Sequence, residues 1–262
     1  MDIDGVLLDT PTERQLVEAV VADARAGRGG WVVTVNVDIL RRLRRDPASR
    51  LLVGRATVVV ADGMPLVWAA RLQRTPVPER VAGSSLVWSL SAAAEGRLSV
   101  YLLGGPPGVA GLAAAALVGQ YPRLRVAGAD SPPMGFEDDP AEVTRSLRAV
   151  IAAAPQIVFC GFGFPKQEWV IARLRPALPG AWFVGCGAAL DFAAGVVPRA
   201  PRWMQASGLE WLHRLAGEPR RLFRRYVLDD MPYAGALIAR SAAAGVPRAL
   251  SLRHYCPERL DE

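Results

Sequence analysis

The sequence predicts an α/β protein: a Rossmann-like, mainly parallel sheet covered by helices, with a C-terminal helical appendage. Short runs of β-branched and aromatic residues recur, and each leads through a glycine or polar turn into a segment of helix length. This alternation is typical of parallel strands covered on both faces. After residue 195, prolines, large aromatic residues and arginines replace it. We therefore expect a core over residues 1–195 and a basic, aromatic-rich appendage over residues 196–262.

Five apolar runs are the predicted strands. They cover residues 31–35, 57–60, 99–103, 157–160 and 182–185. A segment of helix length follows each of the first four runs, and a glycine-containing turn follows the last. The appendage is expected to form short amphipathic helices, with its last dozen residues frayed. The carboxyl ends of the strands should meet at one edge of the sheet, where open α/β sheets bind ligands.

The composition is that of a folded, basic protein. Hydrophobic residues make up 51% of the chain, which excludes a disordered protein. The net charge of +6 and the pI near 9.8 favour a negatively charged partner: nucleic acid, anionic lipid or a phosphorylated small molecule. Residues 196–226 contain seven arginines and two glutamates, a net charge of +5. This segment of the appendage therefore carries nearly all of the excess positive charge.

The cysteines and the N-terminal residues predict a cytoplasmic protein. Cys160, Cys186 and Cys256 are odd in number and form no C-x-x-C motif, which favours reduced thiols over a zinc site. Residues 1–10 contain aspartates and no basic residue, unlike a secretory signal. No stretch reaches the roughly 18 apolar residues of a membrane-spanning helix. We expect contact with a membrane only at its surface.

Two glycine turns follow predicted strands. Gly104 and Gly105 begin one turn, and Gly161 and Gly163 lie in another, within the string GFGFPKQE. Such turns free backbone N–H groups to face an anion at a helix N-terminus, although they are often purely structural. The second turn contains Lys166, the only lysine in a chain with 30 arginines, followed by a glutamine and a glutamate. These side chains can bind phosphate or sugar hydroxyls, so the two turns predict a nucleotide-like ligand.

Polar residues at other strand ends are further candidates for the site. Asp62 follows a strand and either caps the next helix or presents a carboxylate as a general base. Thr34 and Asn36 end the first strong strand and could contact a sugar. Arg80 lies in a loop, where an exposed charge is the simpler interpretation.

The appendage arginines suggest an anion. Arg221, Arg224 and Arg225 are three and four residues apart, so they share a helical face and repel one another unless an anion lies between them. A diphosphate or an acidic lipid headgroup would serve, because guanidinium groups bind phosphate oxygens in bidentate pairs. We favour this interpretation over a solvated face, and we include Arg214 in the cluster.

Several strings, in order from about residue 33 to 226, resemble those of the WecG/TagA/CpsF glycosyltransferases of bacterial surface-polysaccharide synthesis. They are ADG at 61–63, PERVAG at 78–83, GFGFPKQE at 161–168, GAALDFAAG at 187–195, RAPRWM at 199–204, GLEWLHRL at 208–215, EPRR at 218–221 and RRY at 224–226. The resemblance implies transfer of a sugar, N-acetylmannosamine in the founding members, from a UDP-sugar donor to a polyprenyl-diphosphate-linked acceptor. It also implies an inverting enzyme without a metal or other cofactor, bound peripherally to the inner face of the cell membrane.

The resemblance also implies roles for individual residues. Asp62 matches the proposed general base. Gln167 joins Thr34, Asn36 and Arg80 in the pocket around donor and acceptor. Asp191 matches a family position near the nucleotide. Three arginines of the appendage match those that close over the diphosphate: Arg214, Arg221 and Arg224. A general base contributes about 10²–10⁴ in rate, and arginines and helix N-termini would stabilise the departing UDP. The D-x-D triplet at residues 2–4 precedes the first strand and is a poor metal ligand.

Three alternative functions compete with transfer of N-acetylmannosamine. The first is the same family with another donor, such as UDP-glucose or a UDP-uronic acid, in exopolysaccharide synthesis. The second is a dinucleotide-dependent oxidoreductase, but the acidic residue expected about 20 positions after the first glycine turn is displaced to Asp130. The third is a nucleic-acid-binding protein, but the basic segment is also rich in Trp and Leu, as expected of a membrane-surface helix. We therefore expect no nucleic acid partner.

Overall fold

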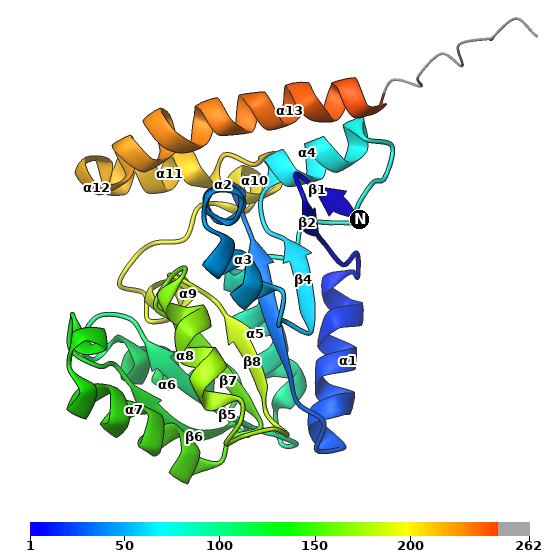
Figure 1. Ribbon diagram of the computed structural model, residues 1–262. Helices are drawn as coiled ribbons and strands as arrows, with labels where there is room; N and C mark the ends of the chain where they lie inside the picture. Colours follow the sequence, from blue (N-terminus) through cyan, green and yellow to red (C-terminus); the bar gives the residue numbers. More distant parts are fainter. Residues whose placement is uncertain (246–262) are drawn as a thin grey trace, which may run out of the picture.

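The computed structural model describes residues 1–245, and it confirms the predicted fold class. Six parallel strands form one sheet in the order β4-β3-β8-β7-β5-β6 (Figure 1). The strands are β3 (Gly30–Val35), β4 (Val58–Ala61), β5 (Ser99–Gly104), β6 (Arg125–Asp130), β7 (Ile157–Gly161) and β8 (Trp182–Gly185). A short antiparallel hairpin, β1 (Asp2–Ile3) and β2 (Val6–Leu7), lies outside this sheet.

Helices cover both faces of the sheet and create two separate cores. On one face pack α1 (Glu13–Arg25), α5 (Gly83–Ala94), α6 (Val109–Gln120) and α9 (Ala189–Ala193). On the other pack α2 (Val37–Arg45), α3 (Pro47–Val53), α4 (Met64–Leu72), α7 (Pro140–Ala153) and α8 (Lys166–Leu174), with the short η1 (Phe136–Asp138) before α7. Neighbouring residues of one strand therefore belong to different cores: Val32 packs with the first group and Val33 with the second.

The strand sequences follow from this double burial. Every residue of β3, β5, β7 and β8 is buried, which is why these strands are continuous apolar runs that the sequence makes easy to recognise. The five predicted strands are these four and β4, each within two residues of its predicted bounds. The prediction missed β6, an edge strand whose residues alternate between exposed and half-buried and include arginine, glycine and aspartate. It also missed the two-residue strands of the hairpin, which are too short to show a pattern.

The C-terminal segment returns to the core. It consists of α10 (Arg202–Ser207), α11 (Glu210–Gly217), α12 (Pro219–Phe223), the π-helical turn η2 (Arg224–Asp230) and the long α13 (Met231–Gly245). α13 runs alongside α4 (Figure 1), and Leu237 is buried in the same core as α4. Tyr233 and Arg240 both donate hydrogen bonds to Asp4 of the N-terminal hairpin. The predicted fraying of the last dozen residues, and Cys256, lie outside the described residues.

Candidate active site

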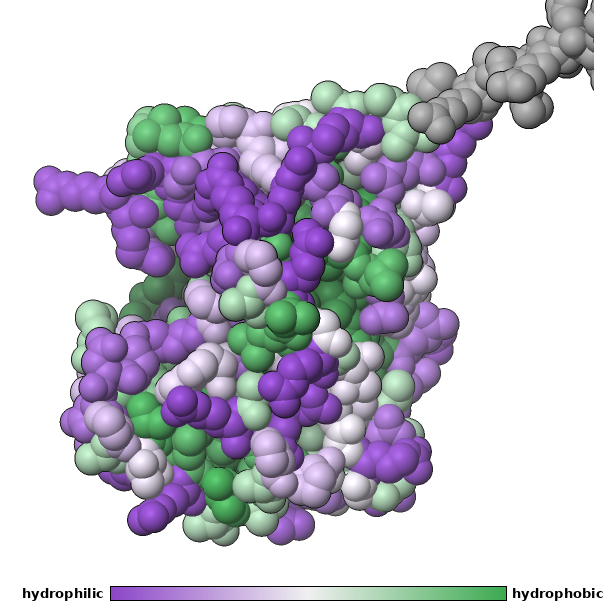
Figure 2. All heavy atoms as spheres, viewed as in Figure 1, coloured by the Kyte–Doolittle hydropathy of each residue, from purple (hydrophilic) through white to green (hydrophobic). Residues whose placement is uncertain are grey.

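A cleft of about 820 Å³ lies over the carboxyl ends of the strands. Its floor is formed by the turns that follow β3, β4, β5, β7 and β8, and its roof by α11, α12 and η2. The surface is visibly hollowed between the layer that holds these C-terminal helices and the half below it (Figure 2). The parallel topology explains the location, because all six strands end at the same edge.

Twelve of the fourteen predicted site residues line this cleft. They are Thr34, Asn36, Asp62, Arg80, Gly105, Gly161, Gly163, Lys166, Gln167, Asp191, Arg214 and Arg221. Gly104 lies behind the lining, with φ of +121°, and a Cβ atom there would come within 2.7 Å of the Gly161 carbonyl oxygen. A side chain at this position would therefore push β5 away from β7. Arg224 is exposed and outside the cleft lining, whereas its neighbour Arg225 lines it.

Asp62 ends β4 at the bottom of the cleft, where its backbone N–H donates to the Val35 carbonyl at 2.7 Å. Burial, together with the negative charge of Glu210, raises the pKa of its carboxyl to about 6. Arg80, the backbone N–H of Gly83 at the start of α5, and Arg214 oppose this rise. A carboxylate with a pKa near 6 is deprotonated at neutral pH and is a stronger base than an ordinary aspartate. The helix-capping alternative does not hold for α4, because Gly63 occupies its N-cap.

Thr34 and Asn36 are fixed by local structure. The Thr34 hydroxyl donates to the Gly185 carbonyl at 3.4 Å, and the hydroxyl is packed against the N-terminus of α5 at Gly83. The Asn36 side-chain oxygen caps α2 by accepting from the Ile39 N–H at 3.0 Å. Both residues line the cleft as predicted, and each also holds together the elements around Asp62.

Gln167 joins two turns of the floor. Its side-chain oxygen accepts hydrogen bonds from the N–H groups of Gly163, at 3.2 Å, and Gly187, at 3.0 Å. Its amide nitrogen donates to the buried carboxyl of Glu168 at 2.9 Å. Gln167 therefore fixes the turn after β7 to the turn after β8. Its neighbour Lys166 forms an ion pair with Glu137 of η1 and so ties a third loop to this turn.

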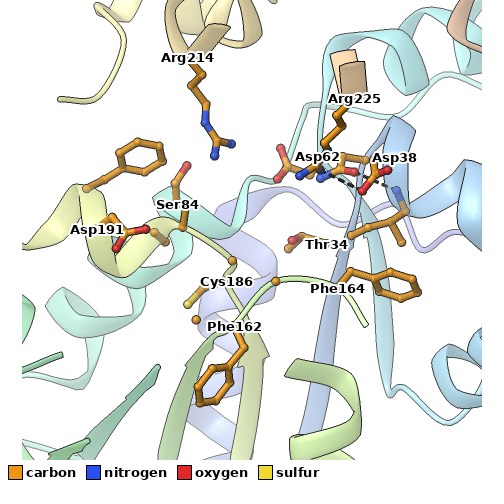
Figure 3. Close-up of a pocket in the computed structure, with 18 of the residues that line it drawn as sticks. Thr34, Asp38, Asp62, Ser84, Phe162, Phe164, Cys186, Asp191, Arg214 and Arg225 are labelled. Carbon is orange, nitrogen blue, oxygen red and sulfur yellow. Dashed lines mark hydrogen bonds and ion pairs between the residues drawn. The ribbon is translucent and has the colours of Figure 1, made fainter. Parts of the chain in front are cut away.

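Asp191 and Arg214 face each other across another part of the cleft (Figure 3). One carboxylate oxygen of Asp191 is buried and, among the residues described, has no hydrogen-bond partner. Burial raises the pKa of Asp191, and the charges of Arg214 and Arg221 lower it. Arg221 is paired with Glu218 at 2.6 Å, whereas Arg214 extends from α11 into the cleft. Asp191 thus offers a free acceptor, and Arg214 offers positive charge above it.

Sequence reasoning missed a group of charged residues where α2 meets the appendage. Asp38 is 3% exposed and forms ion pairs with Arg41 at 2.7 Å and Arg225 at 3.0 Å. Arg41 also contacts Asp230 at 3.1 Å. No signal for this group was present in the sequence, because the partners that η2 supplies, Arg225 for Asp38 and Asp230 for Arg41, lie about 190 residues further along the chain. Glu210 was likewise missed as a site residue, although the GLEWL string that contains it was noted.

A carboxylate able to accept a proton, arginines able to hold phosphate, and glycine turns at the edge of a parallel sheet together define a group-transfer enzyme of the nucleotide-binding type. Residues 1–245 match the sequence profile of the Glycosyl transferase WecG/TagA/CpsF family, so the chain belongs to that family and is a glycosyltransferase. It is similar to the N-acetylglucosaminyldiphosphoundecaprenol N-acetyl-β-D-mannosaminyltransferase of Bacillus spizizenii strain W23. The two are 28% identical over 236 residues, which cover 90% of this chain and 86% of the relative.

Proposed function

We propose that this protein transfers N-acetylmannosamine from a UDP-sugar to N-acetylglucosamine linked to a polyprenyl diphosphate, in the synthesis of a bacterial cell-surface polysaccharide. The observation that carries the proposal is Asp62, a partly buried carboxylate with a raised pKa on the floor of a cleft that Arg214 also lines. The similarity to a mannosaminyltransferase supports the choice of sugar and acceptor.

In the proposed reaction, Asp62 accepts the proton of an acceptor hydroxyl. The hydroxyl oxygen then forms a bond to the anomeric carbon from the side opposite the nucleotide, while the bond from that carbon to the UDP oxygen breaks. The configuration at the anomeric carbon is therefore inverted. UDP leaves with the bonding electron pair, and its growing negative charge needs positive charge nearby. Arg214 is placed to supply it, and Arg221 joins it if its pair with Glu218 opens.

The nucleotide is proposed to lie between the glycine turns and the roof. The unpartnered oxygen of Asp191 would accept a hydrogen bond from a ribose hydroxyl. Gly105 is next to it: a Cβ atom there would be 3.7 Å from that oxygen, so the backbone of the first glycine turn and the carboxylate face the same space. The diphosphate would then lie under Arg214.

The acceptor is proposed to reach the cleft from a membrane. None of the helices described is long and apolar enough to cross a bilayer. The C-terminal helices, however, expose large apolar side chains close to their arginines. These are Trp203, Leu212, Phe223, Leu228 and Met231. Apolar and basic side chains on one surface are typical of proteins that bind the interface of an anionic membrane. On this proposal the enzyme binds the inner face of the cell membrane, the side from which a cytoplasmic UDP-sugar can reach the cleft.

Replacing Asp62 tests the proposed base. The Asp62→Asn variant keeps the shape of the side chain but cannot accept the proton, so release of UDP should fall by about 10²–10⁴. The assay supplies UDP-N-acetylmannosamine and a short-chain polyprenyl-diphosphate N-acetylglucosamine, with unchanged UDP binding and circular dichroism as controls. A variant with full activity would contradict the role of Asp62.

A donor screen tests the sugar. The same acceptor is offered UDP-N-acetylmannosamine, UDP-glucose and a UDP-uronic acid in separate reactions, and products are identified by mass spectrometry. We expect the first donor to react at least tenfold faster than the others. Preference for a different donor would move the enzyme to the alternative function within the same family. A parallel series with EDTA tests whether the arginines suffice without a metal.

A further inference from the structure

Glu210 joins the roof of the cleft to the base site. It begins α11, and its side chain is only 14% exposed. One carboxylate oxygen lies 3.0 Å from Nη1 of Arg80, which comes from the core loop before α5. The other lies 3.9 Å from Nε of Arg199, in the segment that leads from α9 to the appendage, and Arg199 in turn donates to the Ser85 hydroxyl of α5. Glu210 therefore sits between two arginines that belong to different segments.

The same residues act on Asp62. Glu210, Arg80 and Asp62 all line the cleft. The positive charge of Arg80 stabilises the Asp62 carboxylate, and the negative charge of Glu210 destabilises it. The other groups that act on Asp62 from the elements packed around it are Arg214 of α11 and the backbone N–H of Gly83 on α5. Arg80 thus pairs with the Glu210 carboxylate of the appendage, while its positive charge also acts on the Asp62 carboxylate of the core.

The charges around Asp62 matter because a general base needs a pKa high enough to accept a proton readily and low enough for the carboxylate to be deprotonated at the working pH. An arginine that forms a full bidentate pair with a carboxylate holds its proton affinity low, and the carboxylate then accepts a proton poorly. Arg80 has one of its amino groups occupied by Glu210, and this pair is largely shielded from water because the two side chains are 16% and 14% exposed. If the pair of Arg80 and Glu210 served only to hold the appendage on the core, it would not need to lie in the same cleft as Asp62.

We infer that Glu210 is a positioning residue for the reaction proposed above: its carboxylate holds Arg80 beside the base site and keeps that guanidinium from pairing fully with Asp62. The inference rests on the proposed role of Asp62.

The pH profile of the full-length Glu210→Gln variant tests this inference. Removing the negative charge frees Arg80 for Asp62, so the pKa of Asp62 should fall. The acidic limb of kcat/KM for UDP release should move to lower pH by about one unit, and the plateau rate should fall about threefold as the base weakens. The KM for the UDP-sugar should stay the same.

Two further variants act as controls. Glu95→Gln removes a carboxylate that pairs with Arg123 at 3.7 Å, outside the cleft, and should leave the profile unchanged. Glu210→Asp keeps the charge and should keep the acidic limb within a few tenths of a unit of the wild-type position, even if its rate falls.

The outcomes separate the two proposals. If Glu210→Gln folds but loses activity equally at every pH, or its acidic limb stays in place or rises, Glu210 only holds the appendage and the inference is overturned. If Glu210→Gln does not fold, the Glu210→Asp profile decides: a limb displaced by a unit or more overturns the inference, and a limb in place supports it. Full activity of Asp62→Asn would instead end the proposed mechanism itself.

Discussion

Glu168 shows how far a single side chain can depart from its ordinary chemistry. It follows Gln167 in the PKQE string but is 0% exposed, and one of its carboxyl oxygens has no hydrogen-bond partner among the residues described. Burial raises its pKa to about 7, and the hydrogen bond from Gln167 only partly opposes this. The residue is therefore half protonated near neutral pH. Its hydrogen bond to Gln167 also makes it part of the support for both turns of the floor.

The buried carboxyl of Glu168 should make stability depend on pH. Because the folded-state pKa lies above the usual 4.5, folding favours the protonated form. This contribution is complete below about pH 4.5 and is lost as the pH rises through about 7, with a total on the order of 3 kcal/mol. Urea denaturation between pH 5 and 8.5 should show the free energy of unfolding fall more steeply in wild type than in Glu168→Gln. Parallel curves would show that Glu168 is not the group responsible.

Most of the predicted site residues line the cleft, but the sequence did not reveal how they interact. Asp62 and Thr34 could be recognised because polar residues at the ends of apolar strands must lie at the same edge of a parallel sheet, whereas Asp191, on α9, was indicated only by the family resemblance. Glu210 and Asp38 could not be found in this way, because their partners come from distant segments and their importance arises only when the chain has folded. Charge partners of this kind leave no local pattern.

At the scale of elements, the contact between α2 and η2 is unusual in being ionic and buried. Asp38 and Arg41 on α2 meet Arg225 and Asp230 on η2. Burial and the nearby charge of Asp38 raise the pKa of Asp230 to about 6, although both arginines oppose this. Buried charges are tolerated only when they are paired, so this contact fixes the position of η2 closely.

Removing Arg41 should therefore destabilise the protein strongly. The Arg41→Met variant leaves Asp230 paired with Arg225 at 3.7 Å, and it leaves Asp38 paired with Arg225 and the more exposed Arg42. Because a buried partner of both carboxylates is lost, we expect a loss of about 3–5 kcal/mol in the free energy of unfolding. Arg28→Met, which breaks an exposed pair with Asp23 on α1, is the matched control and should cost less than about 1 kcal/mol. Equal losses in the two variants would show that the α2–η2 contact is no stronger than a surface pair.

The same element explains where the prediction for the appendage arginines differs from the structure. The α-helical spacing placed Arg221, Arg224 and Arg225 on one face. The chain from Arg224 to Asp230 instead forms a π-helical turn, which contains more residues than an α-helical one and changes which side chains point inward. Arg225 therefore lines the cleft, and the side chain of Arg224 is exposed to solvent. A wider turn depends on tertiary contacts such as Arg225 with Asp38, so propensity alone does not reveal it.

For the whole molecule, the asymmetry of the surface suggests its orientation. Figure 2 shows hydrophilic side chains concentrated over the layer of C-terminal helices, interrupted by apolar patches. Trp203 of α10 is 64% exposed and Phe223 of α12 is 52% exposed, and both belong to the C-terminal helices, of which α11 and η2 line the cleft. A membrane bound to this layer would lie beside the cleft, and each arginine near an anionic surface would contribute about 1 kcal/mol.

Flotation with anionic vesicles tests this orientation. The full-length protein should float with vesicles that contain phosphatidylglycerol and remain unbound with neutral ones. The double variant Trp203→Ser/Phe223→Ser should lose at least half of the bound fraction. Leu112→Ser on α6 removes an equally exposed apolar side chain from the lower half and should bind as wild type does. Loss of binding in Leu112→Ser alone would place the membrane on the opposite side.

The bonds from Tyr233 and Arg240 to Asp4 link residues separated by 229 and 236 positions. During translation, the first hairpin leaves the ribosome long before the helix that will hold it has been made. The hairpin can therefore be held in place only after α13 has been made, and the roof of the cleft, α11, α12 and η2, comes from the chain just before it. A nascent chain should fold the floor of the cleft first and become active only once α13 has been synthesised.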